Sequence, residues 1–196
     1  MEPLNPWWGL GVYLVATIAS VVIRWPHDAR EKTVKVADDR KGALERFLLV
    51  LVGVGFMVLP VLAMTPLLAF ADYPLHPVAL GAGALVDALG LWLFHRSHAD
   101  LGTNWSITLQ LREDHALVTR GIYAWIRHPM YSAIYCLAIG QALLIANAIA
   151  GPACFVTFTL MFALRVGPEE GMMREKFGDS YADYARRTKR LVPYLF

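Results

Sequence analysis

Five runs of apolar residues alternate with polar segments along the chain, at about 7–23, 44–70, 75–94, 131–147 and 152–164. A helix that crosses a membrane needs about 20 mostly apolar residues, so the pattern predicts five spans, the last of them short. Pro60 and Pro66 fall inside the second run, which predicts a kink or an early end of that helix. Because only a few residues separate the last two runs, we expect them to form a helical hairpin.

The composition favours a membrane protein. Hydrophobic residues make up 57% of the chain and charged residues 17%, against roughly 45–50% and about 25% in soluble domains. No Lys or Arg precedes the first run, so it lacks the positive segment of a cleavable signal peptide and we expect it to be retained. In a hairpin, Cys136 and Cys154 would be offset by about 10–15 Å along the axis, too far for a disulfide. We therefore expect two free thiols.

The positive charges predict an orientation. Of the 18 Lys and Arg residues, seven lie in 24–46, four in 96–127 and seven from 165 onward. Five spans with the N-terminus outside place all of them on the cytoplasmic side, in agreement with the positive-inside bias. We expect a multi-pass protein of the inner or plasma membrane of a prokaryote, with a cytoplasmic C-terminus.

The segments rich in polar and charged residues, 95–128 and the tail from Arg165, lie on the predicted cytoplasmic side, so we expect any catalytic site there. The segment 95–128 contains Gln110 and then His115-Ala116-Leu117-Val118, and Gly121 suggests a tight turn before Tyr123. The alternative for this segment is a polar connector whose apolar residues pack on the bundle.

A second candidate is the stretch Arg127-His128-Pro129-Met130-Tyr131. Proline suits the first turn of a helix, and the exposed N–H groups there, beside His128, could receive a carboxylate. The alternative is ordinary anchoring of a helix end at the membrane interface by Arg, His and Tyr.

A third candidate is Arg165 with Glu169 and Glu170, at the cytoplasmic end of the last run. A buried arginine could bind an anionic group of a substrate, and a carboxylate could bind hydroxyls or an ammonium. The alternative is a surface ion pair between residues i and i+4, worth a few tenths of a kcal/mol. We expect Gly167-Pro168 to interrupt the helix between them.

The remaining polar residues suggest less. Asp87 within the third run is a functional candidate because acids are costly in a membrane, although it could simply hydrogen-bond a neighbouring helix. The glycines around it would allow close helix approach. His95 and His98 have a spacing found in some metal sites, but no third ligand is near, so we expect no metal. Nothing in the basic residues predicts nucleic-acid binding, and those of the tail would contact anionic lipid.

Taken together, these motifs resemble the isoprenylcysteine carboxyl methyltransferase family of integral membrane enzymes. The resemblance runs from about residue 101 to the C-terminus and rests on order and spacing, whereas residues 1–100 are similar only in hydropathy. It is carried by Leu101-Gly102-Thr103-Asn104-Trp105-Ser106, by 115–123, by 127–131, by Glu169-Glu170 and by Phe177-Gly178-Asp179-Ser180-Tyr181-Ala182-Asp183-Tyr184.

The resemblance implies an all-α protein of one integrated domain, with residues 1–100 as a three-span anchor and residues 101–196 as the catalytic half. It implies a cytoplasmic pocket for S-adenosyl-L-methionine, released as S-adenosyl-L-homocysteine, formed by the 95–128 segment and the tail. Arg165 would bind the substrate carboxylate as the catalytic residue. The cofactor site would be lined by Gln110, His115, Ala116, Leu117, Val118, Tyr123, His128, Pro129, Met130, Tyr131 and Glu169.

The chemistry implied is methyl transfer to a lipophilic or lipidated acceptor at the membrane interface. The methyl sulfonium is already electrophilic and a carboxylate is already ionised, so transfer needs positioning and desolvation rather than a general base. Two alternatives remain open. Phospholipid N-methyltransferases have a similar architecture and an amine acceptor, and a non-catalytic membrane protein could share the fold.

Overall fold

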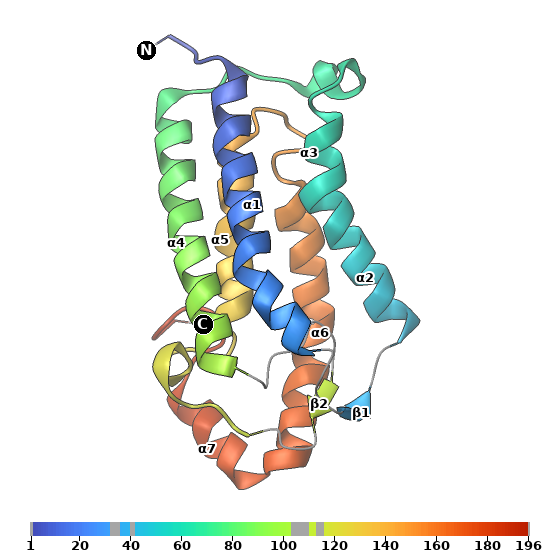
Figure 1. Ribbon diagram of the computed structural model, residues 1–196, viewed down its shortest axis with the longest axis vertical. Helices are drawn as coiled ribbons and strands as arrows, with labels where there is room; N and C mark the ends of the chain where they lie inside the picture. The colour runs from blue at the N-terminus through green and yellow to red at the C-terminus, as the bar shows by residue number, and fades with distance from the viewer. Residues whose placement is uncertain (1, 32–35, 40–41, 103–109, 113–115, 196) are drawn as a thin grey trace.

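The computed structural model describes residues 2–31, 36–39, 42–102, 110–112 and 116–195, and its long helices run side by side (Figure 1). The helices are α1 (Pro6–Glu31), α2 (Ala43–Gly53), η1 (Val54–Val58), α3 (Leu59–Leu62), η2 (Pro66–Ala71), α4 (Pro77–Leu101), η4 (Gly121–Ala124), α5 (Pro129–Leu144), α6 (Ala153–Phe177) and α7 (Asp179–Arg187). Two short strands, β1 (Val36–Asp39) and β2 (Gln110–Arg112), pair antiparallel and add a small ribbon to the predicted helical architecture.

The helices include three stretches, among the described residues, that are long and apolar enough to cross a membrane. They are Pro6–His27, Ala43–Leu62 and Pro77–Leu101. The α5 helix is also apolar but has 16 residues, and α6 has 25 residues, the second half of which is charged. Trp7, Trp8 and Trp25 are exposed near the two ends of α1, where interfacial anchors are expected.

The second apolar run ends early, as its prolines predict. A π-helical turn, η1, leads directly into α3, and the continuous helix stops at Leu62. Pro66 then begins the 3-10 helix η2, whose first turn is capped by Thr65: its Oγ1 accepts a hydrogen bond from the Leu67 N–H at 3.3 Å.

Two helices are longer than the sequence predicted. The α4 helix continues past residue 94 to Leu101, because its buried side still carries Phe94, Ser97 and His98. The α6 helix passes through Gly167 and Pro168, so the predicted interruption there is wrong. Pro168 lies on the exposed side of α6, and the contacts of the buried side outweigh the roughly 3 kcal/mol that a proline costs in a helix.

Glycines bring α4 against α5. A Cβ at Gly83 would lie 2.7 Å from Leu144 Cγ, and one at Gly90 would lie 3.0 Å from Cys136 Cβ. Gly81, in contrast, has no neighbour within 4 Å of such an atom. The prediction of close approach is therefore confirmed at two of the glycines, and both cysteines are free thiols as expected.

Asp87 lies at a third close approach between α4 and α5. Its side chain is buried at 3% exposure against Gly140 of α5, where an added Cβ would lie 1.8 Å from Asp87 Oδ1. Neither carboxyl oxygen has a hydrogen-bond partner within the described part of the chain. The expected hydrogen bond to a neighbouring helix is therefore not found among these residues.

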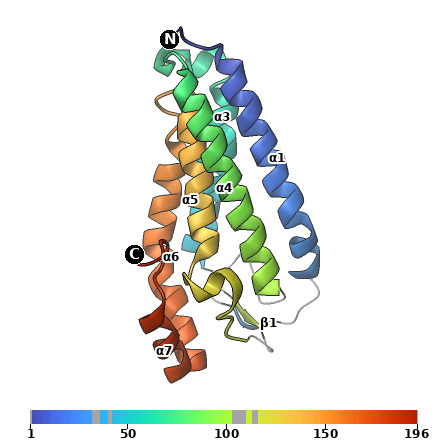
Figure 2. The ribbon, with the colours of Figure 1, turned by 90° about the vertical axis from the view of Figure 1, so that its left-hand side faces the viewer.

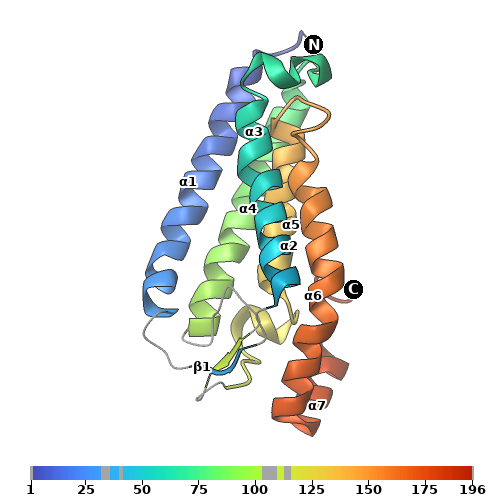
Figure 3. The same cartoon turned by 90° about the vertical axis from the view of Figure 1, so that its right-hand side faces the viewer.

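The polar elements gather at one end of the bundle, which we call the α7 end. It carries the β1–β2 ribbon, η4, α7 and the lower part of α6, and it lies opposite the N-terminus (Figures 1 and 2). Viewed from the side of α2, the ribbon lies below the bundle between α4 and α6 (Figure 3). Residues far apart in the chain therefore meet at this end.

Candidate functional site

A tight turn leads the chain into α5. Gly121 has φ +61°, a conformation that favours glycine, and an added Cβ there would lie 2.2 Å from Asp100 Oδ2. The same carboxylate accepts a hydrogen bond from the Ile122 N–H at 2.9 Å. The turn predicted at Gly121 is thus confirmed, and Asp100 at the end of α4 fixes it.

The chain beyond α7 folds back onto the start of α5. The backbone N–H groups of Arg127 and His128 donate to the carbonyl oxygens of Lys189 and Arg190 at 2.7 and 2.9 Å. The Leu191 carbonyl, one residue after Arg190, accepts a hydrogen bond from Ser132 Oγ at 2.6 Å. These bonds hold residues 189–191, which we call the tail strand, beside residues 127–132.

A buried carboxylate, Glu170 of α6, lies at the centre of the charges that meet here. The Arg127 Nε donates to Glu170 Oε1 at 3.0 Å, and Arg190 Nη2 donates to Oε2 at 2.9 Å. Nε2 of His128 is 3.4 Å from Oε1, and Arg174 Nη2 is 3.7 Å from Oε2. Burial alone would raise the pKa of Glu170, but the hydrogen bonds from His128, Arg190 and Arg127 outweigh it and lower the pKa well below its ordinary value.

A second charged group is built around Arg165. The guanidinium is 9% exposed, its Nη1 is 3.4 Å from Glu45 Oε1, and its Nε is 3.7 Å from Glu169 Oε2. The Tyr131 hydroxyl donates to the same Glu169 carboxylate. This arrangement differs from a surface ion pair, because a second helix, α2, supplies a buried carboxylate.

His128 joins the two charged groups. Its Nδ1 lies 3.7 Å from Glu169 and its Nε2 lies 3.4 Å from Glu170, so the ring stands between adjacent carboxylates. The ring also stacks on Tyr131, with centroids 5.3 Å apart. Tyr131 in turn contacts Phe158 and Phe162 edge-on. The result is a carboxylate, Glu169, beside an aromatic wall.

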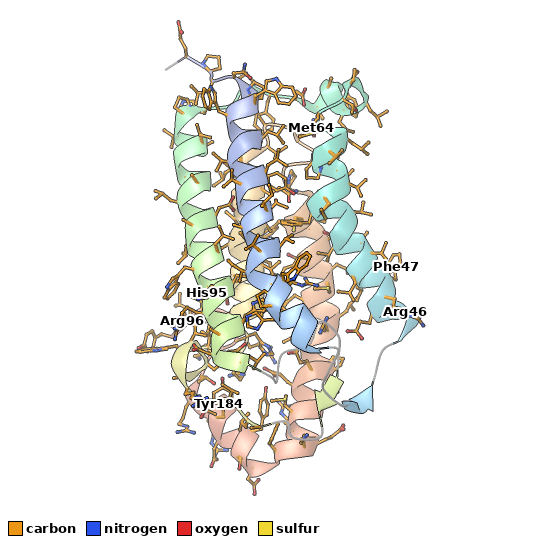
Figure 4. The ribbon with its side chains drawn as sticks, in the orientation of Figure 1. Arg46, Phe47, Met64, His95, Arg96 and Tyr184 are labelled. Atoms are coloured by element: carbon orange, nitrogen blue, oxygen red, sulfur yellow. The ribbon has the colours of Figure 1, made fainter. Side chains whose placement is uncertain are left out.

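Two tyrosines, Tyr184 and Tyr123, connect η4 to α7 and to α4. Tyr184 of α7 donates its hydroxyl hydrogen to the Tyr123 carbonyl at 2.7 Å, and Tyr123 donates to the Ser97 carbonyl at 3.4 Å. Figure 4 places Tyr184 at the α7 end, below the bundle. Burial raises the pKa of both phenols, so each remains a neutral hydrogen-bond donor at neutral pH.

The predicted site residues divide into three sets. The structure brings His128, Tyr131, Arg165 and Glu169 into contact, places Pro129 and Met130 between the first two in the first turn of α5, and bonds Tyr123 of η4 to Ser97 and Tyr184. Gln110 lies in β2 as the Cα partner of Asp39, and Ala116, Leu117 and Val118 lie in the segment that leads to Gly121. His115 lies outside the described residues, as do positions 103–106 of the motif that begins at Leu101.

Four charged residues of this cluster were not assigned to the predicted cofactor or acceptor site. Glu170 and Arg127 were part of the candidate motifs in the sequence but were given no role there. Arg190 was expected to contact lipid, and the structure shows that its guanidinium is hydrogen-bonded to Glu170. Glu45 gave no signal, because a charge at the start of an apolar run is ordinary.

The two histidines with metal-like spacing do not converge. His95 is exposed on the outer side of α4 (Figure 4), whereas His98 is fully buried with its Nδ1 2.8 Å from the Phe94 carbonyl. Over the described ranges, no group of three or more His, Cys, Asp or Glu side chains could hold a metal ion.

A cavity of about 410 Å³ lies at the opposite end of the bundle, among residues such as Leu10, Met64 and Tyr73. Its polar residues are engaged in the fold, since Asn147 Nδ2 donates to Asp72 Oδ1 at 2.6 Å and to the Leu68 carbonyl at 2.8 Å. The charged cluster around Glu170 and Arg165, with the aromatic rings of His128 and Tyr131 beside it, is at the α7 end, so that end is the candidate site.

Comparison with known proteins shows a similarity between part of this chain and one family. The sequence model of the isoprenylcysteine carboxyl methyltransferase family matches residues 86–175. The protein-S-isoprenylcysteine O-methyltransferase of Tribolium castaneum is 32% identical over 115 residues, which are 58% of this chain and 41% of the relative. A protein-S-isoprenylcysteine O-methyltransferase B of Arabidopsis thaliana is 35% identical over 89 residues, 45% of each protein.

A solved structure agrees with these matches. The structure of a eukaryotic intramembrane Ras methyltransferase, an isoprenylcysteine carboxyl methyltransferase, superposes with a TM-score of 0.54 and 27% identity, over 76% of this chain and 50% of that one. The chain spans less than half the length of the curated relatives named above. Residues 86–175 are therefore similar to the isoprenylcysteine carboxyl methyltransferase family, and the fold of the chain resembles that of a solved member of the family.

Proposed function

We propose that the protein is an S-adenosyl-L-methionine-dependent methyltransferase whose acceptor is a lipophilic carboxylate of the isoprenylcysteine kind. The observation that carries this proposal is the meeting of His128, Tyr131, Glu169 and Arg165 at the α7 end. They come from the region that matches the family, and the named relatives are protein-S-isoprenylcysteine O-methyltransferases.

The residues present fit the cofactor. S-adenosyl-L-methionine supplies a methyl group on a positively charged sulfonium. Glu169, with its side chain 33% exposed, offers negative charge to a cation, and the aromatic faces of His128 and Tyr131 offer shielding from water. The other predicted cofactor residues, from Gln110 and 115–118 through Tyr123 to Pro129 and Met130, would complete the pocket.

Arg165 would orient the acceptor. A guanidinium binds a carboxylate through two parallel hydrogen bonds, and its burial at 9% exposure keeps water from competing. Because the acceptor oxygen is already ionised at neutral pH, no residue has to remove a proton. Binding and desolvation at Arg165 and Glu169 are the contributions required of this chain.

An amine acceptor is the second candidate, and one observation favours it. The carboxylates of Glu45 and Glu169 both face Arg165, so the group carries an excess of negative charge that would suit a cation. The two acceptors differ in pH dependence. An amine must lose a proton before it attacks, so its methylation accelerates with rising pH, whereas that of a carboxylate is flat near neutrality.

We also propose five membrane spans, formed by α1, by α2 to α3, by α4, by α5 and by the first half of α6. The N-terminus would be outside and the α7 end cytoplasmic, in the inner membrane of a prokaryote. The distribution of Lys and Arg supports this orientation. A lipophilic acceptor would reach the site from the bilayer between helices.

Calorimetric binding of S-adenosyl-L-homocysteine to the purified full chain tests the proposal. We expect micromolar affinity for the wild type, at least a tenfold loss in His128→Ala because the ring joins both charged groups, and little change in Arg165→Ala. Turnover with an N-acetyl-S-isoprenylcysteine should vanish in Arg165→Ala.

No binding by the wild type in several detergents and lipids would favour the non-catalytic alternative. Binding without methylation of the carboxylate, together with methylation of a phospholipid amine that accelerates with pH, would favour the second candidate. Retention of turnover by Arg165→Ala would remove the role given to that residue.

A further inference from the structure

Glu45 brings a buried carboxylate from the first half of the chain into the candidate site. It lies in the first turn of α2 and is 7% exposed. Its neighbours Arg46 and Phe47 are exposed and project away from the bundle (Figure 4). Burying a charge is costly unless an opposite charge or hydrogen bonds compensate for it, and the Arg165 guanidinium is the opposite charge beside it.

Glu45 differs from the other carboxylate at Arg165 in how it is held. Glu169 is one turn further along the same helix and its side chain is 33% exposed, so its ion pair does not connect Arg165 to another helix. Glu45 is 8% exposed as a side chain and belongs to a different helix. It approaches Nη1, whereas Glu169 approaches Nε, so the two carboxylates restrain different nitrogens of one planar group.

A second link joins the same part of the chain to the candidate site. Strand β1, shortly before α2, pairs with β2, so that Asp39 is the Cα partner of Gln110. Residues 36–39 therefore pair with the strand that holds Gln110, and Glu45 contacts Arg165. These two contacts link the described residues between α1 and the middle of α2 to the candidate site.

We propose that Glu45 is a positioning residue for acceptor binding, acting through Arg165. The proposal rests on the proposed function, in which Arg165 binds the acceptor carboxylate. Glu45 fixes the plane of the guanidinium relative to α2, and the acceptor carboxylate would bind the guanidinium in that orientation. Without Glu45, Arg165 loses its restraint from α2, so the acceptor carboxylate meets a guanidinium whose orientation is less fixed.

The test compares Glu45→Ala and Glu45→Gln with Arg46→Gln, an exposed charge on the same helical turn. Glu45→Ala should raise the KM for an N-acetyl-S-isoprenylcysteine about tenfold and leave the affinity for S-adenosyl-L-homocysteine within about twofold. Glu45→Gln should have an intermediate effect, because its amide oxygen accepts a hydrogen bond but carries no charge. Arg46→Gln should resemble the wild type.

A double-mutant cycle asks whether Glu45 acts through Arg165. Binding of the acceptor to protein loaded with S-adenosyl-L-homocysteine needs no turnover, so it can be measured in Arg165→Lys. In that background Glu45→Ala should add less than about a twofold loss, against about tenfold alone. An equal loss in both backgrounds would overturn the proposal.

The proposal also fails if Glu45→Ala weakens cofactor binding as much as acceptor binding, or if its KM matches that of Arg46→Gln. If Glu45→Ala does not fold, Glu45→Gln decides by the same criteria. Failure of the proposed function looks different, because the wild type itself would then bind no cofactor or leave the carboxylate unmethylated.

Discussion

The Glu170 carboxylate connects α6, the turn before α5 and the tail strand. It receives hydrogen bonds from Arg127 and Arg190, and its side chain is 3% exposed. Arg127 also donates from Nη1 to the Ala185 carbonyl at 2.9 Å and to the Thr188 carbonyl. A buried ion pair adds little by comparison with apolar packing, but breaking one leaves the partner charges uncompensated. The site geometry therefore depends on this residue without needing it to touch substrate.

Glu170→Gln should lower the thermal midpoint of unfolding, by an amount that corresponds to a loss of about 2–3 kcal/mol in stability. The loss should be smaller than for a fully buried ion pair because Arg190 is half-exposed. Unfolding can be followed in detergent with a dye that reacts with the buried Cys154 thiol. Asp183→Asn, which removes an exposed pair with Arg186, is the control and should change little. Equal midpoints for the two variants would contradict the role of Glu170.

The same carboxylate gives a pH dependence. Its pKa in the folded protein lies below that of about 4.3 in an unfolded chain. The stabilisation is therefore complete above the unfolded pKa and is lost as the pH falls from there toward the folded value. Between pH 6 and pH 3 the wild-type midpoint should fall more steeply than that of Glu170→Gln.

The sequence indicated the helices well and their ends poorly. Apolar runs locate each helix because burial in a bundle or a membrane requires them, but runs cannot show where a helix leaves the apolar region. The α4 helix extends to Leu101 through polar residues, and α6 passes Pro168, since contacts with other elements decide both ends. The candidate motifs included Arg165 and Glu169, and the structure brings these two residues together with His128 and Tyr131. Glu45 escaped prediction because its contact depends on how α2 packs against α6.

Packing between α4 and α5 can be tested with glycines two residues apart. Gly83→Ala places a Cβ 2.7 Å from Leu144 Cγ, a fully buried side chain, and should destabilise the bundle by about 1–3 kcal/mol. Gly81→Ala meets nothing within 4 Å and should be neutral or gain up to about 1 kcal/mol from helix propensity. Midpoints of thermal unfolding in detergent measure both, and a similar loss for the two would contradict the packing described.

The whole molecule has two chemically different ends. All 18 Lys and Arg residues lie in the segments that the proposed topology places on one side. Met64 lies near the N-terminal end of the bundle and Arg46 toward the α7 end (Figure 4), and both are exposed. The two ends can therefore be tagged separately.

Labelling of intact cells tests the orientation. With a membrane-impermeant maleimide, Met64→Cys should be labelled from outside, whereas Arg46→Cys should react only after lysis. The wild type, with Cys136 half-buried and Cys154 buried, is the control for background reaction. The reverse pattern would invert the proposed topology, and labelling of both sites before lysis would exclude it.

The backbone pairing of residues 127 and 128 with 189 and 190 also orders events during biosynthesis. The tail strand follows every helix of the bundle in the chain, so it leaves the ribosome after the last of them. A nascent chain can therefore have all its membrane helices inserted while Arg127 and His128 still lack the backbone partners of the finished protein. Insertion precedes assembly of the site, and a chain interrupted before residue 189 would occupy the membrane without a closed site.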